Sequence, residues 1–322
     1  MGVLCKTSSF IKTVIKNRFF SLKSLKMCSC DNKIAKPEIR TLHYVFKIAD
    51  RRKTMEFYKN ILGMKVLRHE EFADGCEASC NGPYANRWSK TMVGYGPEDD
   101  HFVFELTYNY PIHHYDKGND FIGVTIKSQD ILKRAVENSW PIINGNVLEA
   151  PGGYKFFIDD EPQSDNPIDK VTFSCSNLEE TINYWNCILG MKVYSRDDES
   201  KTAILGYSFK QTKLEFIQIT EKINRAEAFG RIAFSCPDEQ QLVIEAKVKQ
   251  IEGKILVPLT SLDTPGKATV RVIILADPDG LEICFVNDAP FRKLSQYTPD
   301  DEKILIVQMQ KDDERMLEEK KI

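Results

Sequence analysis

One six-residue string occurs twice in this chain and limits its fold more than any other feature. ILGMKV stands at residues 61–66 and again at residues 188–193, each time after a segment whose apolar residues recur at helical spacing. Because glycine readily takes the left-handed conformation that ends a helix, Gly63 and Gly190 are predicted helix stops. MKV then starts a strand in both copies. The chain is therefore predicted to repeat a strand–helix–strand unit.

The residues around this string repeat as well. At the same offset, residues 43–50 align with residues 170–177, and both are short β-rich runs that end in a helix-capping side chain, Asp50 or Asn177. Further strand-like runs follow each helix. Two weaker units of the same kind fill the remaining sequence, at residues 121–158 and 230–286. These patterns predict an α+β fold of four βαβββ modules in two pairs.

The sequence divides into four stretches. Residues 1–38 form a basic extension, residues 39–160 and 169–290 hold one pair of modules each, and residues 291–322 form a charged tail that is expected to be helical. A chain of 322 residues is long enough for two domains with their own cores.

The basic extension differs in composition from everything after it. Six lysine or arginine residues precede the first acidic residue, Asp31, and apolar residues recur at roughly helical spacing without a continuous apolar run. This pattern is typical of a mitochondrial transit peptide and not of a secretory signal. We therefore expect a mitochondrial protein; the alternative is a disordered basic extension on a cytoplasmic one.

Composition narrows the classes of partner. A formal charge of −3 gives no reason to expect nucleic acid, and the apolar runs are too short to cross a membrane. The nine cysteines are scattered and lack paired zinc-binding spacing, although Cys28 lies near Cys30 and Cys76 near Cys80. We expect reduced thiols packed as small apolar side chains. The classes of partner that remain are a small-molecule ligand and another protein.

Several motifs resemble those of a known family. Paired βαβββ modules are the architecture of the vicinal oxygen chelate superfamily, and the sequence is similar to glyoxalase I over roughly residues 41–288. The segments that carry this resemblance are His43 seven residues before Asp50 followed by FYKNILGM, ELTYNY at 105–110, GRIAFSCPD at 230–238 and ADPDG at 276–280. The resemblance implies two glyoxalase-like domains. It also implies a zinc or nickel ion held by four side chains, two from each module of a pair, and a glutamate that moves the substrate proton.

The first two modules differ in how well they match this metal site. His43 and Glu105 occupy both ligand positions of the first module, so they are the residues expected to hold a metal ion. In the second module, Phe121 and Phe157 align with the ligand position and with the base glutamate. Phenylalanine can neither bind a metal ion nor transfer a proton. The second module is therefore predicted to have lost the site.

The last two modules carry cations where ligands are expected. Lys170 replaces the first ligand of the third module, whereas Glu215 keeps the second. In the fourth module, Arg231 stands at the ligand position and Cys284 at the position of the base. Each cation is expected either to pair with Glu105 or Glu215 or to bind an anionic metabolite.

The sequence leaves the pairing of the modules open. If neighbouring modules pair, one cleft holds His43, Glu105, Phe121 and Phe157, and the other holds Lys170, Glu215, Arg231 and Cys284. If the outer modules pair, one cleft holds His43, Glu105, Arg231 and Cys284, and the other holds Phe121, Phe157, Lys170 and Glu215. Neither arrangement gives any cleft four metal ligands.

These losses lead to a functional expectation. We expect a glyoxalase I-like protein with an incomplete metal site that binds a small anionic metabolite or a protein partner. It would have little or no lactoylglutathione lyase activity and no tightly bound metal. The alternative is a lyase or isomerase that acts on another substrate through zinc or nickel held by His43 and Glu105, with water or Glu282 completing the site. A third hypothesis is a scaffold whose partner binds the outer strands or the charged tail.

Overall fold

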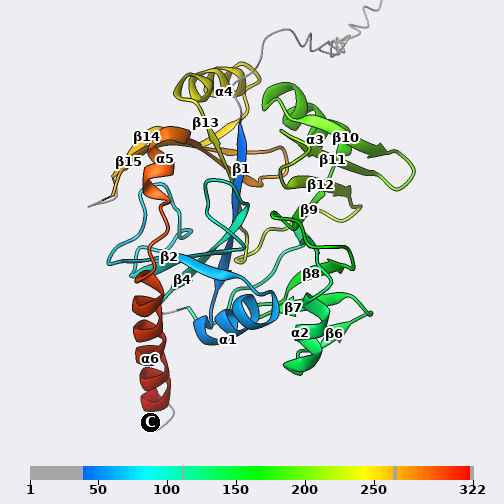
Figure 1. The fold of residues 1–322 in the computed structure, drawn as a ribbon. Helices are drawn as coiled ribbons and strands as arrows, with labels where there is room; N and C mark the ends of the chain where they lie inside the picture. The colour runs from blue at the N-terminus through cyan, green and yellow to red at the C-terminus, as the bar shows by residue number, and fades with distance from the viewer. Residues whose placement is uncertain (1–38, 111, 264–266, 320–322) are drawn as a thin grey trace, which may run out of the picture. The chain divides into compact units, whose positions relative to one another are not determined.

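The computed structural model describes residues 39–110, 112–263 and 267–319. The predicted transit peptide lies outside these residues. Two eight-stranded sheets dominate the described chain (Figure 1). Among the described helices, none combines the length and apolar character needed to span a bilayer.

The first sheet is built from the first and last modules. Its strand order is β14-β15-β16-β13-β1-β4-β3-β2, and β1 lies antiparallel to β13 where the two modules meet. The first module contributes β1 (Arg40–Ile48), β2 (Lys65–Phe72), β3 (Trp88–Gly94) and β4 (Val103–Asn109). The last module contributes β13 (Arg231–Cys236), β14 (Lys254–Asp263), β15 (Thr269–Ala276) and β16 (Glu282–Asn287).

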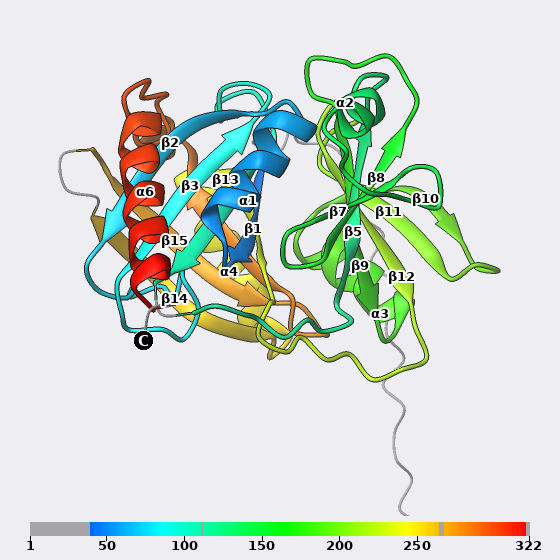
Figure 2. The same ribbon diagram turned by 90° about the horizontal axis from the view of Figure 1, so that it is seen from below.

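The second sheet is built from the two inner modules. Its order is β10-β11-β12-β9-β5-β8-β7-β6, with β5 antiparallel to β9 at the junction (Figure 2). The second module contributes β5 (Phe121–Lys127), β6 (Ile142–Ile143), β7 (Val147–Ala150) and β8 (Tyr154–Asp159). The third contributes β9 (Ile168–Cys175), β10 (Lys192–Asp197), β11 (Thr202–Gly206) and β12 (Lys213–Gln218).

The outer arrangement of modules is therefore the one that forms. Each sheet takes one module from residues 39–160 and one from residues 169–290, so the sheets do not coincide with these two stretches of sequence. The predicted α+β fold of four modules in two pairs is confirmed.

The repeated string does what the sequence predicts. Helices α1 (Arg51–Met55) and α3 (Leu178–Asn183) begin at Asp50 and Asn177, whose side chains accept hydrogen bonds from backbone N–H groups of the first turn. Each helix widens into a π-helical turn, η1 (Glu56–Ile61) or η2 (Tyr184–Ile188). Gly63 and Gly190 follow with φ of 76° and 85°, the left-handed region that glycine occupies at little cost.

Aromatic side chains join the two sheets. The ring of Phe46 on β1 lies 4.6 Å from Tyr154 and 5.4 Å from Phe121, measured between ring centroids. Phe121 also stacks on Tyr44 at 5.3 Å. Because one cluster of buried residues contains side chains from all four modules, the two sheets share a core.

Four further helices pack against the strands. They are α2 (Ile131–Glu137), α4 (Asp238–Gln250), α5 (Asp288–Leu294) and α6 (Asp301–Glu319). In the charged tail, α6 packs against β2 (Figure 2). Leu305 of α6 is 1% exposed, and Arg51 of α1 forms an ion pair of 2.6 Å with Asp312. Helix α6 thus packs against the first module through the buried Leu305 and through ion pairs with α1 and η1.

Candidate functional site

The outer pairing of modules brings four predicted positions together. His43 on β1 lies opposite Ala233, which is in register with Cys284, and Arg231 stands two residues before Ala233 on the same face of β13. Glu105 on β4 is in register with Val45, two residues after His43. His43, Glu105, Arg231 and Cys284 accordingly line one cavity of about 100 Å³, here called the first cleft.

His43 and Glu105 face each other in this cleft. His43 Nε2 lies 3.5 Å from Glu105 Oε2, and the two residues are 8% and 6% exposed. His43 Nδ1 is buried without a hydrogen-bond partner. Burial lowers the pKa of His43 to about 3, and burial also raises the pKa of Glu105, against the opposing effect of Lys90 and Arg68. The imidazole is therefore neutral near pH 7.

The cations beside Glu105 are held by other carboxylates. Arg68 Nε lies 2.5 Å from Glu98, and Arg68 Nη1 lies 3.1 Å from Glu70. Lys90 Nζ lies 2.8 Å from Glu70. Neither cation forms an ion pair with Glu105. Their positive charge still lowers the free-energy cost of burying the Glu105 carboxylate, and it leaves the carboxylate oxygens unoccupied by these two side chains.

Arg231 makes four hydrogen bonds to groups around the cleft. Its Nη2 donates to Glu282 at 2.8 Å and its Nε donates to the same oxygen at 3.0 Å. Its Nη1 donates to the backbone carbonyl of Ala78 at 2.9 Å, and Nη2 also donates to the carbonyl of Ser79 at 3.1 Å. The carboxylate partner of Arg231 is thus Glu282 and not Glu105, because Glu282 lies directly opposite Arg231 in the β13–β16 ladder.

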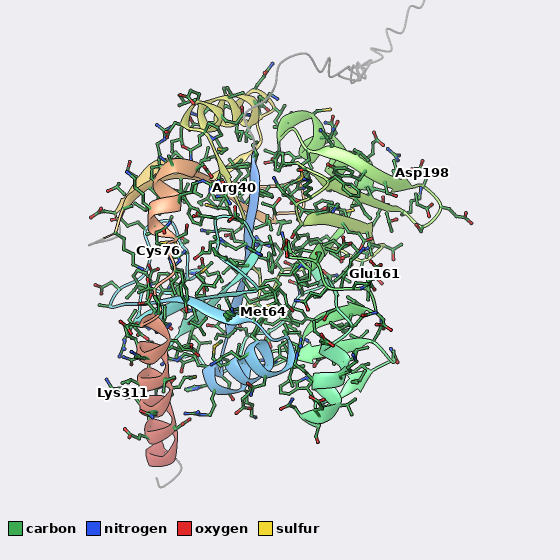
Figure 3. The ribbon with its side chains drawn as sticks, in the orientation of Figure 1. Arg40, Met64, Cys76, Glu161, Asp198 and Lys311 are labelled. Atoms are coloured by element: carbon green, nitrogen blue, oxygen red, sulfur yellow. A yellow bond between two sulfur atoms is a disulfide. The ribbon has the colours of Figure 1, made fainter. Side chains whose placement is uncertain are left out.

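A loop between β2 and β3 closes one side of the first cleft. Cys76 and Cys80 form a disulfide, so the expectation of reduced thiols is wrong for this pair (Figure 3 marks Cys76). Ala78, inside the disulfide ring, is 1% exposed and belongs to the apolar cluster of the cleft. Phe291 and Leu294 of α5 line the cavity as well. The other close pair, Cys28 and Cys30, lies outside the described residues.

The residues of the first cleft do not fit the four-ligand metal site of glyoxalase I. An imidazole and a carboxylate are present, but the third position holds a guanidinium, which has no lone pair for a metal ion. At the fourth position, burial raises the pKa of the Cys284 thiol to about 12, which disfavours the thiolate that a metal needs. Among the described residues, no three His, Cys, Asp or Glu side chains are grouped closely enough to hold a metal ion.

The corresponding positions of the second sheet are occupied differently. Lys170 Nζ lies 2.6 Å from Glu215, and the hydroxyl of Thr172 donates to the other oxygen of Glu215 at 2.8 Å. These three side chains stand on one face of β9 and β12, because Thr172 and Glu215 are in register. Their ion pair fills the place that the ligands of the third module would take.

In the second module, the residue at the predicted ligand position is Gly123 and not Phe121. Cys284 pairs with Ala233, two residues after Arg231, whereas Phe157 pairs with Thr125, two residues after Gly123. Gly123, and not Phe121, therefore stands at the position equivalent to Arg231. A Cβ on Gly123 would lie 2.4 Å from the ring of Phe157, so that ring covers the site.

A bulge explains the displacement of Phe121. The β5–β9 register shifts between Phe121 and Gly123, which turns the Phe121 ring into the core against Tyr44. A one-residue bulge moves every later side chain to the other face, and the run FIGVTI gives no sign of it except the glycine.

A larger pocket opens beside Phe157, and sequence reasoning did not find it. Its volume is about 300 Å³, and its lining includes Phe121, Phe157, Tyr154, Asp120 and the two lysines Lys117 and Lys155. The only sequence signal is the glycine pair at 152–153, which has φ of 89° and 81° and brings the backbone close to Lys117.

Some charged side chains of this pocket have hydrogen-bond or ion-pair partners, and others do not. Lys117 Nζ donates to the carbonyl of Gly153 at 2.8 Å, whereas the exposed side chain of Lys155 has no hydrogen bond or ion pair with any described residue. Asp120 Oδ2 lies 3.7 Å from Arg225 Nε, and neither atom has a hydrogen bond. Burial raises the pKa of Asp120. Counting the Asp120–Arg225 pair as neutral, the pocket presents a net positive charge from its two lysines.

The sequence is similar to known glyoxalase-like proteins over most of its length. Residues 40–163 match the glyoxalase/bleomycin resistance protein/dioxygenase superfamily, and residues 177–294 match the C-terminal domain of glyoxalase domain-containing protein 4-like proteins. Mouse glyoxalase domain-containing protein 4 is 52% identical over 278 residues, which cover 85% of this chain and 93% of the mouse protein. A Caenorhabditis elegans protein named glyoxalase 1 is 46% identical over 276 residues, covering 85% of this chain and 97% of its own length.

A solved structure has a similar fold. The crystal structure of glyoxalase I from Zea mays superposes with a TM-score of 0.62 at 25% identity, covering 80% of this chain and 96% of the maize chain.

Proposed function

This chain belongs to the glyoxalase I-like family that includes glyoxalase domain-containing protein 4, and from that membership we propose that it binds a small anionic metabolite and has little or no lactoylglutathione lyase activity. One observation carries the proposal: at the metal position of each sheet, a residue that cannot ligate stands in place of a ligand. In the first cleft this residue is Arg231, and at the corresponding position of the second sheet it is Lys170.

We expect lyase activity to be lost because of the residue types in the first cleft and because of its size. The Arg231 guanidinium has no lone pair to bind a divalent ion, and no glutamate occupies the position of the base. The cavity of about 100 Å³ is also small, since ligand pockets usually measure about 300–1,000 Å³. A glutathione adduct does not fit the first cleft as it stands.

The anion-binding site belongs to the second sheet. Lys170 and Arg231, the cations singled out in the sequence, are both neutralised by glutamates. Lys155 and Lys117 are not, and the pocket between them has the volume of an ordinary ligand site. Phe157 and Tyr154 offer an apolar wall. The ligand that suits this pocket is a carboxylate or phosphate with a small apolar body.

Thermal stabilisation by phenylpyruvate tests the binding site. We expect the melting temperature of the wild-type protein to rise with phenylpyruvate, and the apparent affinity to fall by about tenfold in Lys155→Met, because one charge-assisted contact is lost. Lys133→Met is the matched control, since Lys133 lies on α2 outside the pocket and pairs with Asp130. Equal stabilisation of all three proteins, or none, would refute the site.

Metal content and turnover test the lost lyase activity. Protein purified without added metal should carry well under one equivalent and should not convert methylglyoxal and glutathione. The alternative, a metal-dependent lyase or isomerase using His43 and Glu105, rests on the unpartnered Nδ1 of His43 and the contact of its other nitrogen with Glu105. Stoichiometric zinc or nickel that is lost in Glu105→Ala and kept in Glu215→Ala would establish that alternative.

The basic extension carries a separate proposal. Its composition supports mitochondrial targeting. Residues 1–38 fused to a fluorescent protein should accumulate in mitochondria, and the same fusion with its lysines and arginines replaced by glutamine should not. A cytoplasmic distribution of the first fusion would disprove targeting.

A further inference from the structure

The loop that closes the first cleft is fastened from inside its disulfide ring. Cys76 and Cys80 enclose three residues, and the middle one, Ala78, packs into the apolar cluster that includes Ala233 and Val272. The backbone carbonyls of Ala78 and Ser79 accept hydrogen bonds from Arg231. The disulfide therefore shapes the turn that presents these carbonyls to the cleft.

The backbone of this turn is unfavourable at one residue. Ser79 has a φ of 51°, which is unfavourable for a residue other than glycine, asparagine or aspartate. Below the ring, the loop is anchored independently: Asn81 is fully buried, accepts from the N–H of Cys76 and donates to Asn109. Opening of the ring would release residues 77–80 while Asn81 holds the base of the loop at Cys76.

The disulfide can be reached from solvent. Glu77 and Ser79 are exposed and both cysteines are partly exposed, so a reductant can approach the sulfurs. Cys80 lines the first cleft together with Cys284, which is partly buried against the same apolar cluster as Ala78. Access to Cys284 consequently reports whether the loop is closed.

We propose that the Cys76–Cys80 disulfide is a redox switch that controls access to the first cleft. In the oxidised state Ala78 closes the cleft and Arg231 holds the loop. Two thiol groups of a small thiol reductant supply two electrons and two protons, the Cys76–Cys80 bond breaks, and the reductant becomes a disulfide. The freed loop then gives up its hydrogen bonds to Arg231, and the cleft opens.

Alkylation of Cys284 tests this switch on the full chain. Protein is either left oxidised or treated with dithiothreitol that is then removed, and iodoacetamide labelling is followed by peptide mass spectrometry. We expect reduction to speed Cys284 labelling by about tenfold or more, because labelling follows the fraction of open cleft. Cys236, which is buried away from the cleft lining, should stay unlabelled in both states.

Two variants separate loop closure from loss of fold. Cys76→Ser/Cys80→Ser should label at the fast rate with or without dithiothreitol. Arg231→Met should speed labelling of the oxidised protein, whereas Arg271→Met should not, because Arg271 pairs with Asp238 away from the loop. The proposal is overturned if Cys76 and Cys80 remain free thiols in protein purified without reductant, or if the labelling rate of Cys284 is the same in both states.

Discussion

Removal of Arg68 should destabilise this protein more than any surface change, and the cost should come from the carboxylate left behind. Arg68 and Glu98 form a pair whose side chains are each 2% exposed. Among described residues, the Glu98 carboxylate contacts only Arg68, whereas Glu70 also has Lys90 and Lys267. Arg68→Met therefore leaves one buried charge without compensation.

The magnitude follows from the desolvation of that charge. Breaking a buried ion pair from one side costs about 3–5 kcal/mol, while replacing both partners with apolar side chains of similar volume costs far less. We expect Arg68→Met to lower the free energy of unfolding by about 3–5 kcal/mol, and Arg68→Met/Glu98→Met to recover about 2 kcal/mol or more of it. Arg87→Met is the control, because its pair with Glu71 is half exposed and contributes about 1 kcal/mol or less.

Urea unfolding followed by tryptophan fluorescence and circular dichroism measures these differences, provided that both probes give the same transition. If Arg68→Met costs less than about 1 kcal/mol, or if the double variant loses the sum of both single losses, the desolvated carboxylate does not dominate and the reasoning fails.

Three further changes test other parts of the structure. Leu305→Ala should cost about 2–5 kcal/mol in urea unfolding, and Ile304→Ala on the exposed side of the same helix about 0.5 kcal/mol or less; equal losses would mean that α6 is not packed as described. Burial raises the pKa of Asp277 to about 6, so its folded-state stabilisation is complete below pH ~4 and is lost as the pH rises through about 6. Asp277→Asn should thus gain up to about 3 kcal/mol relative to wild type between pH 4 and 7, and a constant difference across that range would contradict the shift. Lys170→Met should cost about 1–3 kcal/mol, because the half-buried Glu215 keeps only the Thr172 hydroxyl, and thermal melts of unchanged midpoint would show that the pair is solvated.

The beginnings and ends of the two repeated helices were predictable from the sequence, because residues next to them in the chain determine both. Asp50 and Asn177 cap their helices, and Gly63 and Gly190 end them, at the positions that the repeated string indicates. Each of these interactions spans only a few residues, so the letters at one place suffice.

Pairing between distant modules was not predictable in the same way. β1 can be flanked by any antiparallel strand with a matching apolar face, and β5 and β13 both read as such runs. The choice of β13 depends on packing of side chains from all four modules, which no single segment encodes.

The candidate site was predicted in its residue types and missed in its contacts. His43, Glu105, Arg231 and Cys284 do line one cavity, as expected for outer pairing. Arg231, however, binds Glu282 across the β13–β16 ladder and two loop carbonyls, and a bulge displaces Phe121 from the ligand position predicted for it on β5. Cross-strand neighbours and bulges are set by register, and register is invisible until the partner strand is known.

The interleaved order of the modules imposes a sequence of events during synthesis. The inner modules are consecutive in the chain, so the second sheet is complete once residue 218 has been made. β1 must wait about 190 residues for β13, which is roughly 10–40 s at a ribosomal rate of about 5–20 residues per second. Throughout that interval β1 presents an unpaired apolar edge, the kind of surface that chaperones cover and that aggregates when left bare. A nascent chain of this protein therefore needs protection longest at its earliest strand.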